Sequence, residues 1–261
     1  MTEAPVPRAA RHHLVLVPSD FERGLLGLAE GDGVERFACG VGPVAAGVET
    51  ALLLLRRKPD HCWLVGLAGT RDAGQVPVGA VLIGDAVRNE AVGAGSGADF
   101  VDLAGMGLDG DGPGQPDVLS LKVPDEAALG RARAALAALA ADAPGTGASP
   151  VLHVLHVGTV GTVAAASGDA AAAAGWARRH PDVRVEEMEG WAVALACRRA
   201  GVPLTVVRAV GNVCGDRDVA GWRTAEAMAA LDAVLAALLH APPGAAPSGG
   251  ASRPAPRDRA P

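Results

Sequence analysis

The sequence predicts an α/β fold in which a largely buried mixed sheet forms the centre of a single domain. Short, β-branched apolar runs alternate along the chain with stretches of helical pattern, as in folds where helices cover a sheet. The predicted strands are nearly continuous in apolar residues, which is typical of strands buried on both faces. With 261 residues and 49% hydrophobic residues, the chain is long enough for one sizeable core.

The elements follow one another in a regular order. Strands are expected at residues 13–17, 63–67, 78–87, 151–157, 183–187 and 204–210. Helices are expected at residues 44–57, 125–141, 170–179, 190–200 and 224–240. Residues 93–117 are rich in Gly and Asp and show no period, so they predict a long loop that is either a substrate lid or a surface insertion.

The two ends of the chain differ from the rest in composition. Residues 1–11 are polar and contain Pro, and residues 242–261 consist almost entirely of Pro, Ala, Gly, Ser and Arg. Such segments bury too little apolar surface to offset the entropy of ordering, so both ends are expected to be disordered. The globular domain is therefore expected to span residues 12–241.

Charge and hydropathy limit the partners of the chain. The net charge is −6 and no basic block stands out, so a nucleic acid partner is not expected. No apolar run reaches the roughly 20 residues of a membrane span, and the N-terminus lacks the apolar region of a secretory signal. We therefore expect a soluble, cytoplasmic protein with no membrane partner.

The four cysteines are widely spaced. Cys39, Cys62, Cys197 and Cys214 form neither a CxxC pair nor a zinc knuckle. Cys62, Cys197 and Cys214 lie in apolar stretches and are interpreted as buried free thiols in a reducing compartment. No cluster of metal-ligating residues is found, so no metal is expected.

A glycine turn at residues 40–45 (GVGPVA) formally matches the G-x-G-x-x-A pattern of dinucleotide sites. Such a site also needs an acidic residue after the next strand, whereas Asp60 precedes its strand. Pro43 removes one N–H group from the turn that would bind phosphate. A turn that lets the following helix pack on the sheet is the favoured interpretation, and no cofactor is expected.

The most informative segment is residues 185–190 (VEEMEG), where an apolar strand runs directly into three carboxylates and then into a helix. Ligands of α/β sheets bind at the carboxyl ends of strands, and carboxylates there can accept hydrogen bonds from sugar hydroxyls. A methionine between them can lie against the apolar face of a sugar. Taken alone, however, the segment is also explained as acidic residues that complement a helix dipole.

The order of several motifs favours the first explanation. The sequence resembles the purine nucleoside phosphorylase and nucleosidase superfamily, and in particular its futalosine hydrolase branch. The resemblance is strongest at residues 179–190 and 206–212, continues at residues 215–222, and is weaker at residues 40–46 and 66–69. It implies a single-domain, three-layer α/β sandwich with a central twisted mixed sheet. It also implies an active site at the strand ends near a subunit interface, hence a homodimer or a higher homo-oligomer.

The resemblance also implies roles for individual residues. Glu22 would activate the attacking water, although a surface glutamate in a polar turn is the alternative. Glu189 would bind the ribose hydroxyls and Met188 would contact the ribose. The remaining substrate-binding residues would be Glu187, Ala68, Gly69 and Arg208.

These roles suit cleavage of an N-ribosyl bond, which builds positive charge on the sugar and negative charge on the departing purine. Glu189 supplies the electrostatic partner of the sugar and Glu22 supplies the base. Methylthioadenosine nucleosidases of the superfamily carry an aspartate at the position of Asn212. The Asn212 NH₂ group instead suits N7 and the carbonyl O6 of a 6-oxopurine. Asparagine is a poor proton donor, so the purine leaves as a bound anion or takes a proton from Asp216 or Asp218.

The expected reaction is therefore hydrolysis of a 6-oxopurine nucleoside. For the futalosine hydrolase branch this means conversion of futalosine to hypoxanthine and dehypoxanthine futalosine in menaquinone biosynthesis. Leu64 and Leu67 occupy positions where bacterial phosphorylases carry an arginine and a serine for phosphate, which favours water as the nucleophile. The alternatives are a nucleosidase for methylthioadenosine or inosine, a nucleoside-binding homologue without turnover and, more distantly, a phosphorylase.

Some positions depart from the family pattern. Trp191 stands where a small residue is typical, Gly211 replaces a serine, and Ala166 falls where the family has an aromatic residue. Base stacking is then expected from Phe100 or Phe21. The benzoate group of futalosine needs a cation, for which Arg217 and Arg88 are the alternatives.

Overall fold

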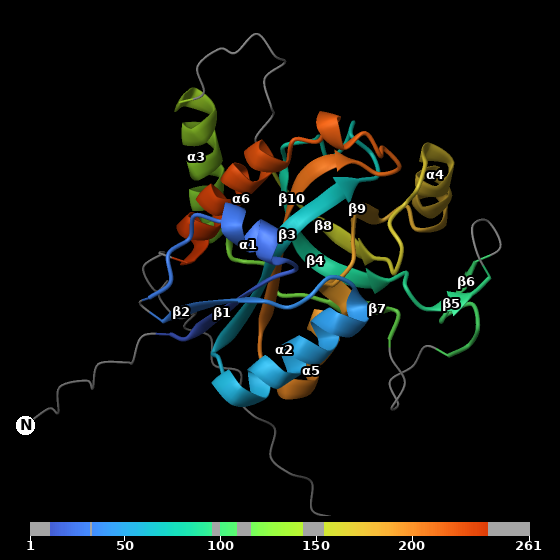
Figure 1. Ribbon diagram of the computed structural model, residues 1–261, viewed down its shortest axis with the longest axis horizontal. Helices are drawn as coiled ribbons and strands as arrows, with labels where there is room; N and C mark the ends of the chain where they lie inside the picture. The colour runs from blue at the N-terminus through green and yellow to red at the C-terminus, as the bar shows by residue number, and fades with distance from the viewer. Residues whose placement is uncertain (1–10, 32, 96–99, 109–115, 143–153, 240–261) are drawn as a thin grey trace, which may run out of the picture.

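The computed structural model describes residues 11–31, 33–95, 100–108, 116–142 and 154–239. An eight-stranded mixed sheet runs through the middle, with helices on both of its faces (Figure 1). Its strands are β1 (His13–Val17), β2 (Val34–Ala38), β3 (His61–Thr70), β4 (Val81–Asn89), β7 (Val118–Ser120), β8 (Leu155–Thr162), β9 (Val183–Glu187) and β10 (Leu204–Val213). The helices are α1 (Asp20–Leu25), α2 (Pro43–Arg57), α3 (Glu126–Asp142), α4 (Ala170–Arg179), α5 (Gly190–Ala200) and α6 (Thr224–Leu239). The predicted α/β fold with a central mixed sheet is confirmed.

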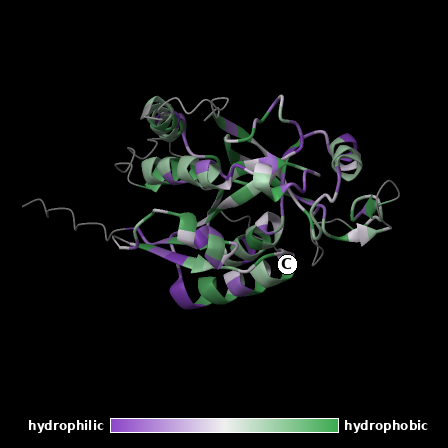
Figure 2. Cartoon of the chain, turned by 45° about the horizontal axis from the view of Figure 1, so that its top comes forward, coloured by the Kyte–Doolittle hydropathy of each residue, from purple (hydrophilic) through white to green (hydrophobic). Residues whose placement is uncertain are grey.

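Each face of the sheet has its own hydrophobic core. On one face α2 and α5 pack together, and Leu53 and Val193 are buried there. On the other face α3 and α6 pack together, with Leu136 and Leu231 in the core. Figure 2 shows α2 along the lower edge, largely green and turning purple at its C-terminal end. The sheet is therefore covered on both sides, which accounts for its continuous apolar strands.

The central strands close into a ring. β3 and β10, each ten residues long, pair in parallel. On its other edge β10 pairs with β4, β4 pairs with β8, and β8 pairs with β9. β9 returns to β3 in a short antiparallel ladder that pairs Gly69 with Glu186 and Thr70 with Val185. This closure gathers the carboxyl ends of β3, β8, β9 and β10 in one region, where Figure 1 shows them converging.

Several strands extend further toward their carboxyl ends than the sequence predicts. β3 continues to Thr70, β8 to Thr162 and β10 to Val213. These extensions contain Gly, Thr and Asn between the apolar residues, and Gly and Asn are depleted in strands. β2, β7 and the small hairpin of β5 (Gly93–Ala94) and β6 (Val101–Asp102) are absent from the prediction.

The predicted disordered segments 1–11 and 242–261 lie outside the described residues, apart from Arg11. Within the predicted loop 93–117, the structure describes residues 93–95, 100–108 and 116–117, which include the β5–β6 hairpin. Cys62, Cys197 and Cys214 are buried and free, as predicted, and Cys39 is buried and free as well. No helix within the described ranges is long and apolar enough to cross a membrane.

Candidate active site

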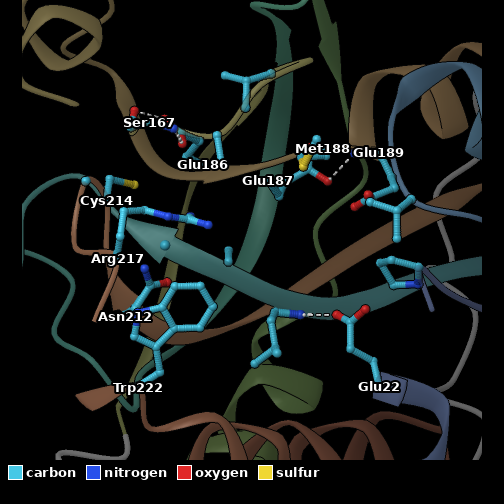
Figure 3. A pocket seen from close by; sticks show the side chains of 18 residues that line it. Glu22, Ser167, Glu186, Glu187, Met188, Glu189, Asn212, Cys214, Arg217 and Trp222 are labelled. Carbon is cyan, nitrogen blue, oxygen red and sulfur yellow. Dashed lines mark hydrogen bonds between the residues drawn. The ribbon is translucent and has the colours of Figure 1, made fainter. Parts of the chain in front are cut away.

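A cavity lies where the carboxyl ends of the ring strands converge, and Figure 3 shows the side chains around it. The predicted site residues that line it are Glu22, Ala68, Gly69, Glu187, Met188, Glu189 and Asn212. Arg208 is absent from this lining; it is fully buried behind it. The sequence motifs thus converge on one cavity, although they come from four different parts of the chain.

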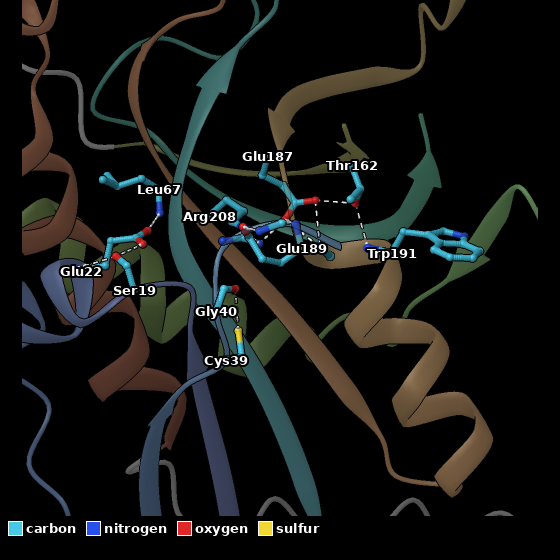
Figure 4. A network of polar contacts seen from close by, with 12 residues as sticks. Ser19, Glu22, Cys39, Gly40, Leu67, Thr162, Glu187, Glu189, Trp191 and Arg208 are labelled. Atoms are coloured by element: carbon cyan, nitrogen blue, oxygen red, sulfur yellow. Dashed lines mark hydrogen bonds and ion pairs between the residues drawn. The ribbon is translucent and has the colours of Figure 1, made fainter. Parts of the chain in front are cut away.

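Glu22 is presented by the short helix α1. The helix begins after Ser19, whose side chain accepts a hydrogen bond from the Glu22 amide at 3.2 Å. The Ser19 hydroxyl donates to Glu22 Oε2 at 2.7 Å, and the amide of Leu67 donates to Oε1 at 2.9 Å (Figure 4). The carboxylate is buried and fixed from two elements, yet each oxygen keeps an acceptor site because a carboxylate accepts about four hydrogen bonds. Glu22 is therefore a wall residue of the cavity and differs from the surface glutamate of the alternative interpretation.

Gly66 makes this arrangement possible. A Cβ atom at this position would lie 2.7 Å from Glu22 Oε1 and 2.8 Å from Arg208 Nη1. A side chain here would displace the Glu22 carboxylate and the Arg208 guanidinium from their present positions. The missing side chain at Gly66 therefore leaves room for the Glu22 carboxylate and the Arg208 guanidinium, which both lie where its Cβ atom would be.

Glu189 follows β9 at the start of α5. Its Oε1 accepts from the Gly42 amide at 3.0 Å, and its Oε2 pairs with Arg208 Nη2 at 3.2 Å. Each oxygen thus keeps room for a further donor on the cavity side. Burial raises the pKa of the Glu189 carboxyl to about 7; the positive charge of Arg208 opposes this rise and the negative charge of Glu187 adds to it.

Glu187 also lines the cavity, but its oxygens are already engaged by the protein. Thr162 Oγ1 and the Gly190 amide donate to Oε1, and the amides of Glu189 and Gly190 donate to Oε2. Arg208 Nη2 also donates to Oε2 (Figure 4). These donors fill the acceptor capacity of a carboxylate. Contrary to the sugar-binding role expected for it, Glu187 holds the β9–α5 turn and Arg208 in place.

Asn212 reaches the cavity through an irregularity in β10. The register with β3 shifts between Val210 and Asn212, so Gly211 is the extra residue of a bulge. The Asn212 amide nitrogen donates to the carbonyl oxygens of Val213 at 3.0 Å and Asp216 at 3.5 Å. The NH₂ group that the sequence assigns to the base is thus engaged by the backbone, and the amide oxygen lies on the side of Gly69.

Trp222 presents an aromatic ring to the cavity, a role that the sequence does not predict for it. Its indole N–H donates to the Asp216 carbonyl at 3.3 Å, and the guanidinium of Arg217 lies 5.5 Å from its ring centroid. Phe21 is 66% exposed and Phe100 packs edge-on against Trp176, and neither lines the cavity. The expectation of stacking by Phe21 or Phe100 is therefore wrong.

A second polar wall faces Asn212 and Trp222 across the cavity (Figure 3). It consists of Glu186 on β9 and Ser167, which follows β8. Ser167 donates to Glu186 through its amide at 2.7 Å and its hydroxyl at 2.8 Å. Behind Glu186, the Arg71 guanidinium forms ion pairs with both Glu186 and Glu90. Burial raises the pKa of the Glu90 carboxyl, and the positive charge of Arg71 opposes this rise.

Of the remaining candidate residues, Arg217 and Leu67 line the cavity and the others lie outside it. Asp216 and Asp218 lie on the exposed loop after β10 and do not line the cavity. Arg88 pairs with Asp182 at 3.2 Å outside the cavity, whereas Arg217 lines it. Leu67 lines the cavity and Leu64 is buried in the core.

Further neighbours complete the lining. Cys214 lines the cavity, and burial raises the pKa of its thiol to about 12, so it is a neutral, weakly polar neighbour. The glycine turn donates the Gly42 amide to Glu189, which gives this turn a role other than dinucleotide binding. Within the described residues, no group of three or more His, Cys, Asp or Glu side chains is arranged to hold a metal ion.

The family of the chain follows from comparison with known proteins. A model of the phosphorylase superfamily matches residues 14–240, so the chain belongs to this superfamily, as its motifs predict.

Among its relatives, the chain is 36% identical to the futalosine hydrolase of Streptomyces coelicolor over 208 residues, covering 78% of this chain and 77% of that protein. It is 30% identical over 191 residues to the 5′-methylthioadenosine/S-adenosylhomocysteine nucleosidase of Marinomonas sp., covering 73% and 72% of the two chains.

Solved structures share the fold. The 5′-methylthioadenosine/S-adenosylhomocysteine nucleosidase of Colwellia psychrerythraea, in complex with adenine, matches with a TM-score of 0.66 at 20% identity over 88% of this chain and 95% of that chain. The native futalosine hydrolase of Helicobacter pylori matches with a TM-score of 0.62 at 14% identity over 88% and 97% of the two chains. The resemblance to this superfamily and to its futalosine hydrolase branch is confirmed.

Proposed function

We propose that this chain is a nucleosidase that hydrolyses the N-ribosyl bond of a 6-oxopurine nucleoside, with futalosine as the candidate substrate. The observation that carries the proposal is that Glu22 and Glu189 line one cavity and each keeps acceptor sites open. The similarity to futalosine hydrolases supports the choice of substrate. The product of the ribosyl side would be dehypoxanthine futalosine, within menaquinone biosynthesis.

In the proposed reaction, a water molecule held by Glu22 attacks C1′ of the ribose. The water proton passes to Glu22, and the electron pair of the C1′–N9 bond leaves with the purine. The fixed donors Ser19 and Leu67 orient the Glu22 carboxylate toward the cavity. Ionised Glu189 stabilises the positive charge that develops on the ribose and accepts hydrogen bonds from its hydroxyls. Met188 lines the cavity beside Glu189 and offers an apolar surface for the sugar (Figure 3).

The base would occupy the end of the cavity formed by Asn212 and Trp222. The Asn212 amide oxygen lies beside Gly69 and can accept a hydrogen bond from the released base once the purine anion has taken up a proton at N7 from solvent water. Trp222 would contribute the stacking surface that Ala166, on the same cavity, lacks. This assigns the base to the end of the cavity opposite Glu22.

Hydrolysis is favoured over phosphorolysis by the lining of the cavity. Arg217 is the cation among the described lining residues, and it lies at the Trp222 end, away from Glu22. A phosphate nucleophile would instead need cationic donors beside C1′. The identity to the Marinomonas nucleosidase supports a second candidate, hydrolysis of methylthioadenosine.

The test is to incubate the purified protein with futalosine, inosine and methylthioadenosine, with and without phosphate, and to measure the released bases. Release of hypoxanthine from futalosine without phosphate is expected. Release of adenine alone would favour the second candidate, and strict phosphate dependence would contradict hydrolysis. Nucleoside binding without turnover by the wild-type chain would contradict an enzymatic role.

The same assay with Glu22→Gln tests the mechanism. The variant keeps the size of the side chain but removes the base, so kcat should fall by about 10²–10⁴-fold while KM changes little. Glu126→Gln on the exposed face of α3 is the matched control and should behave as the wild type. Unchanged turnover in Glu22→Gln would remove Glu22 from the mechanism.

We also propose that the chain forms a homodimer through α2. Val44, Val48, Leu52 and Leu55 lie on one face of this helix and are 79%, 58%, 38% and 72% exposed. A row of exposed apolar side chains at this spacing is typical of a helix–helix interface. Leu55→Glu should convert a dimer into a monomer in sedimentation experiments, and a wild-type monomer would contradict the proposal. The cytoplasmic location stays a prediction from the sequence.

A further inference from the structure

Glu186 is a buried carboxylate that the proposed mechanism does not use. It is 6% exposed, lines the cavity near the carboxyl end of β9 and pairs with Gly69 of β3. Asn212 pairs with the same glycine from the other side, in the parallel ladder of β10. Glu186 and Asn212 therefore flank β3 at the end of the cavity assigned to the base.

The hydrogen bonds of Glu186 leave part of its acceptor capacity open. Oε1 accepts from the Ser167 amide at 2.7 Å; Oε2 accepts from the Ser167 hydroxyl at 2.8 Å and lies 3.4 Å from Arg71 Nη2. A carboxylate accepts about four hydrogen bonds, so Oε1 can take one more. Glu187, its neighbour in sequence, has no such site because backbone amides, Thr162 and Arg208 fill it.

The orientation of Glu186 is fixed by two neighbouring side chains, Ser167 and Arg71. Ser167 contacts both oxygens, and Arg71, whose side chain is 1% exposed, lies behind Oε2 and is itself anchored by Glu90. A carboxylate that is held from behind and from one side presents its open acceptor site in one direction. Such fixed acceptors discriminate strongly between ligands, because a mismatched partner leaves a buried polar group unpaired.

We infer that Glu186 determines base specificity by accepting a hydrogen bond from the N1–H group of a 6-oxopurine. A 6-oxopurine carries a proton at N1, whereas adenine presents a lone pair there, so adenine would place an acceptor against an acceptor. This inference rests on the proposed function, since it requires a purine in the cavity. Glu186 would then be a second residue that recognises the base, in addition to Asn212.

Competitive binding of free bases tests the inference, because free bases bind independently of the group at the 5′ carbon. Inhibition constants for hypoxanthine, 1-methylhypoxanthine and adenine are measured with the wild type, Glu186→Gln and the control Glu126→Gln. Replacing a charged acceptor with a neutral amide should weaken hypoxanthine about tenfold. Because the amide can also donate to N1 of adenine, the preference for hypoxanthine over adenine should fall by more than tenfold. Binding of 1-methylhypoxanthine, which lacks the N1–H group, should change little.

The outcomes separate the inference from the proposed function. If the wild type binds no purine base, both fail. If the wild type prefers hypoxanthine and Glu186→Gln keeps that preference within about twofold, the inference alone is overturned. If Glu186→Gln does not fold, Ser167→Ala is used instead. It removes one donor that orients Glu186 and should lower the same preference about threefold, and an unchanged preference would then overturn the inference.

Discussion

Two buried arginines each hold carboxylates of the cavity wall in place, Arg208 beside Glu189 and Arg71 beside Glu186. Arg208 pairs with Glu187 and Glu189, and Arg71 pairs with Glu90 and Glu186. In each cluster one carboxylate is locked by the protein and the other keeps an acceptor site toward the cavity. A buried cation thus serves both times to hold one carboxylate in place for a ligand.

The clusters differ in what surrounds the locked carboxylate. Glu187 is held by backbone amides and Thr162 in addition to its arginine. Glu90 is held by Arg71, with His180 Nε2 3.9 Å away. Burial raises the pKa of Glu90, so this residue can take up a proton when its partner is lost. Glu187, Glu189 and Glu22 all stabilise the charged form of Arg208. Removing Arg208 should therefore destabilise the folded protein more than removing Arg71.

Arg208→Met should therefore cause the largest loss. It leaves buried carboxylates uncompensated, which typically costs about 3–5 kcal/mol in the free energy of unfolding. Denaturant unfolding monitored by circular dichroism measures this loss. Arg208→Lys, which keeps the charge, should lose less. A loss below about 1 kcal/mol in Arg208→Met would show that the two clusters do not differ as described.

Arg71→Met should cost less, about 1–3 kcal/mol, because Glu90 can become neutral and then lacks only a hydrogen-bond partner. In this variant Glu90 holds its proton in the folded state to a higher pH than in the unfolded state. Its stability should therefore decrease as the pH rises, more steeply than in the wild type. Unfolding experiments across pH 5–9 test this, and a pH dependence identical to that of the wild type would contradict it.

The raised pKa of Glu189 predicts a pH dependence of the reaction. Because its carboxyl titrates near 7 and must be ionised, kcat/KM should fall about tenfold per pH unit well below pH 7. Since its folded-state pKa lies above the unfolded value, the contribution of Glu189 to stability is present at low pH and lost as the pH rises through about 7. Glu189→Gln should lack the acidic limb of the profile. Persistence of that limb would assign it to another group.

The smallest effect is expected at Trp222, which lies outside both arginine clusters. Trp222→Ala removes a stacking surface of about 0.5–1.5 kcal/mol, so binding of hypoxanthine should weaken roughly two- to tenfold. Competitive inhibition measures this change. Phe21→Ala, at a residue that is exposed and outside the cavity, is the control and should bind as the wild type. A larger effect in Phe21→Ala would restore the stacking role that the sequence suggests for it.

The cluster of Arg208, Glu187 and Glu189 could be identified from the sequence because its residues lie in two compact motifs. The segment that contains Glu187 and Glu189 stands at the end of an apolar strand, and Arg208 lies within the next strand. What the sequence does not show is which of the two carboxylates is free. That depends on the hydrogen bond from Thr162, at the end of β8, and on how tightly the turn at Gly190 closes.

The cluster of Arg71, Glu90 and Glu186 could not be predicted from the sequence because no local pattern connects its members. Arg71 follows β3, Glu90 follows β4 and Glu186 lies in β9, and only the closed ring places them together. The strand ends that carry this cluster contain Gly, Thr and Asn, so strand propensity fades where the site begins. Trp222 was missed as a stacking residue because it belongs to the loop after β10, whose path the sequence leaves open.

The short antiparallel ladder between Gly69 and Glu186 also bears on how the chain folds. It joins strands that are far apart in the sequence, so its formation costs more loop-closure entropy than the neighbouring β1–β2 pair. Residues of both paired strands line the cavity, so we expect a partly folded chain without this ladder to lack a complete binding site. Binding of a purine would therefore stabilise the closed ring over partly folded chains in which this ladder has not formed, and a ligand added during refolding would report the closing of the ring.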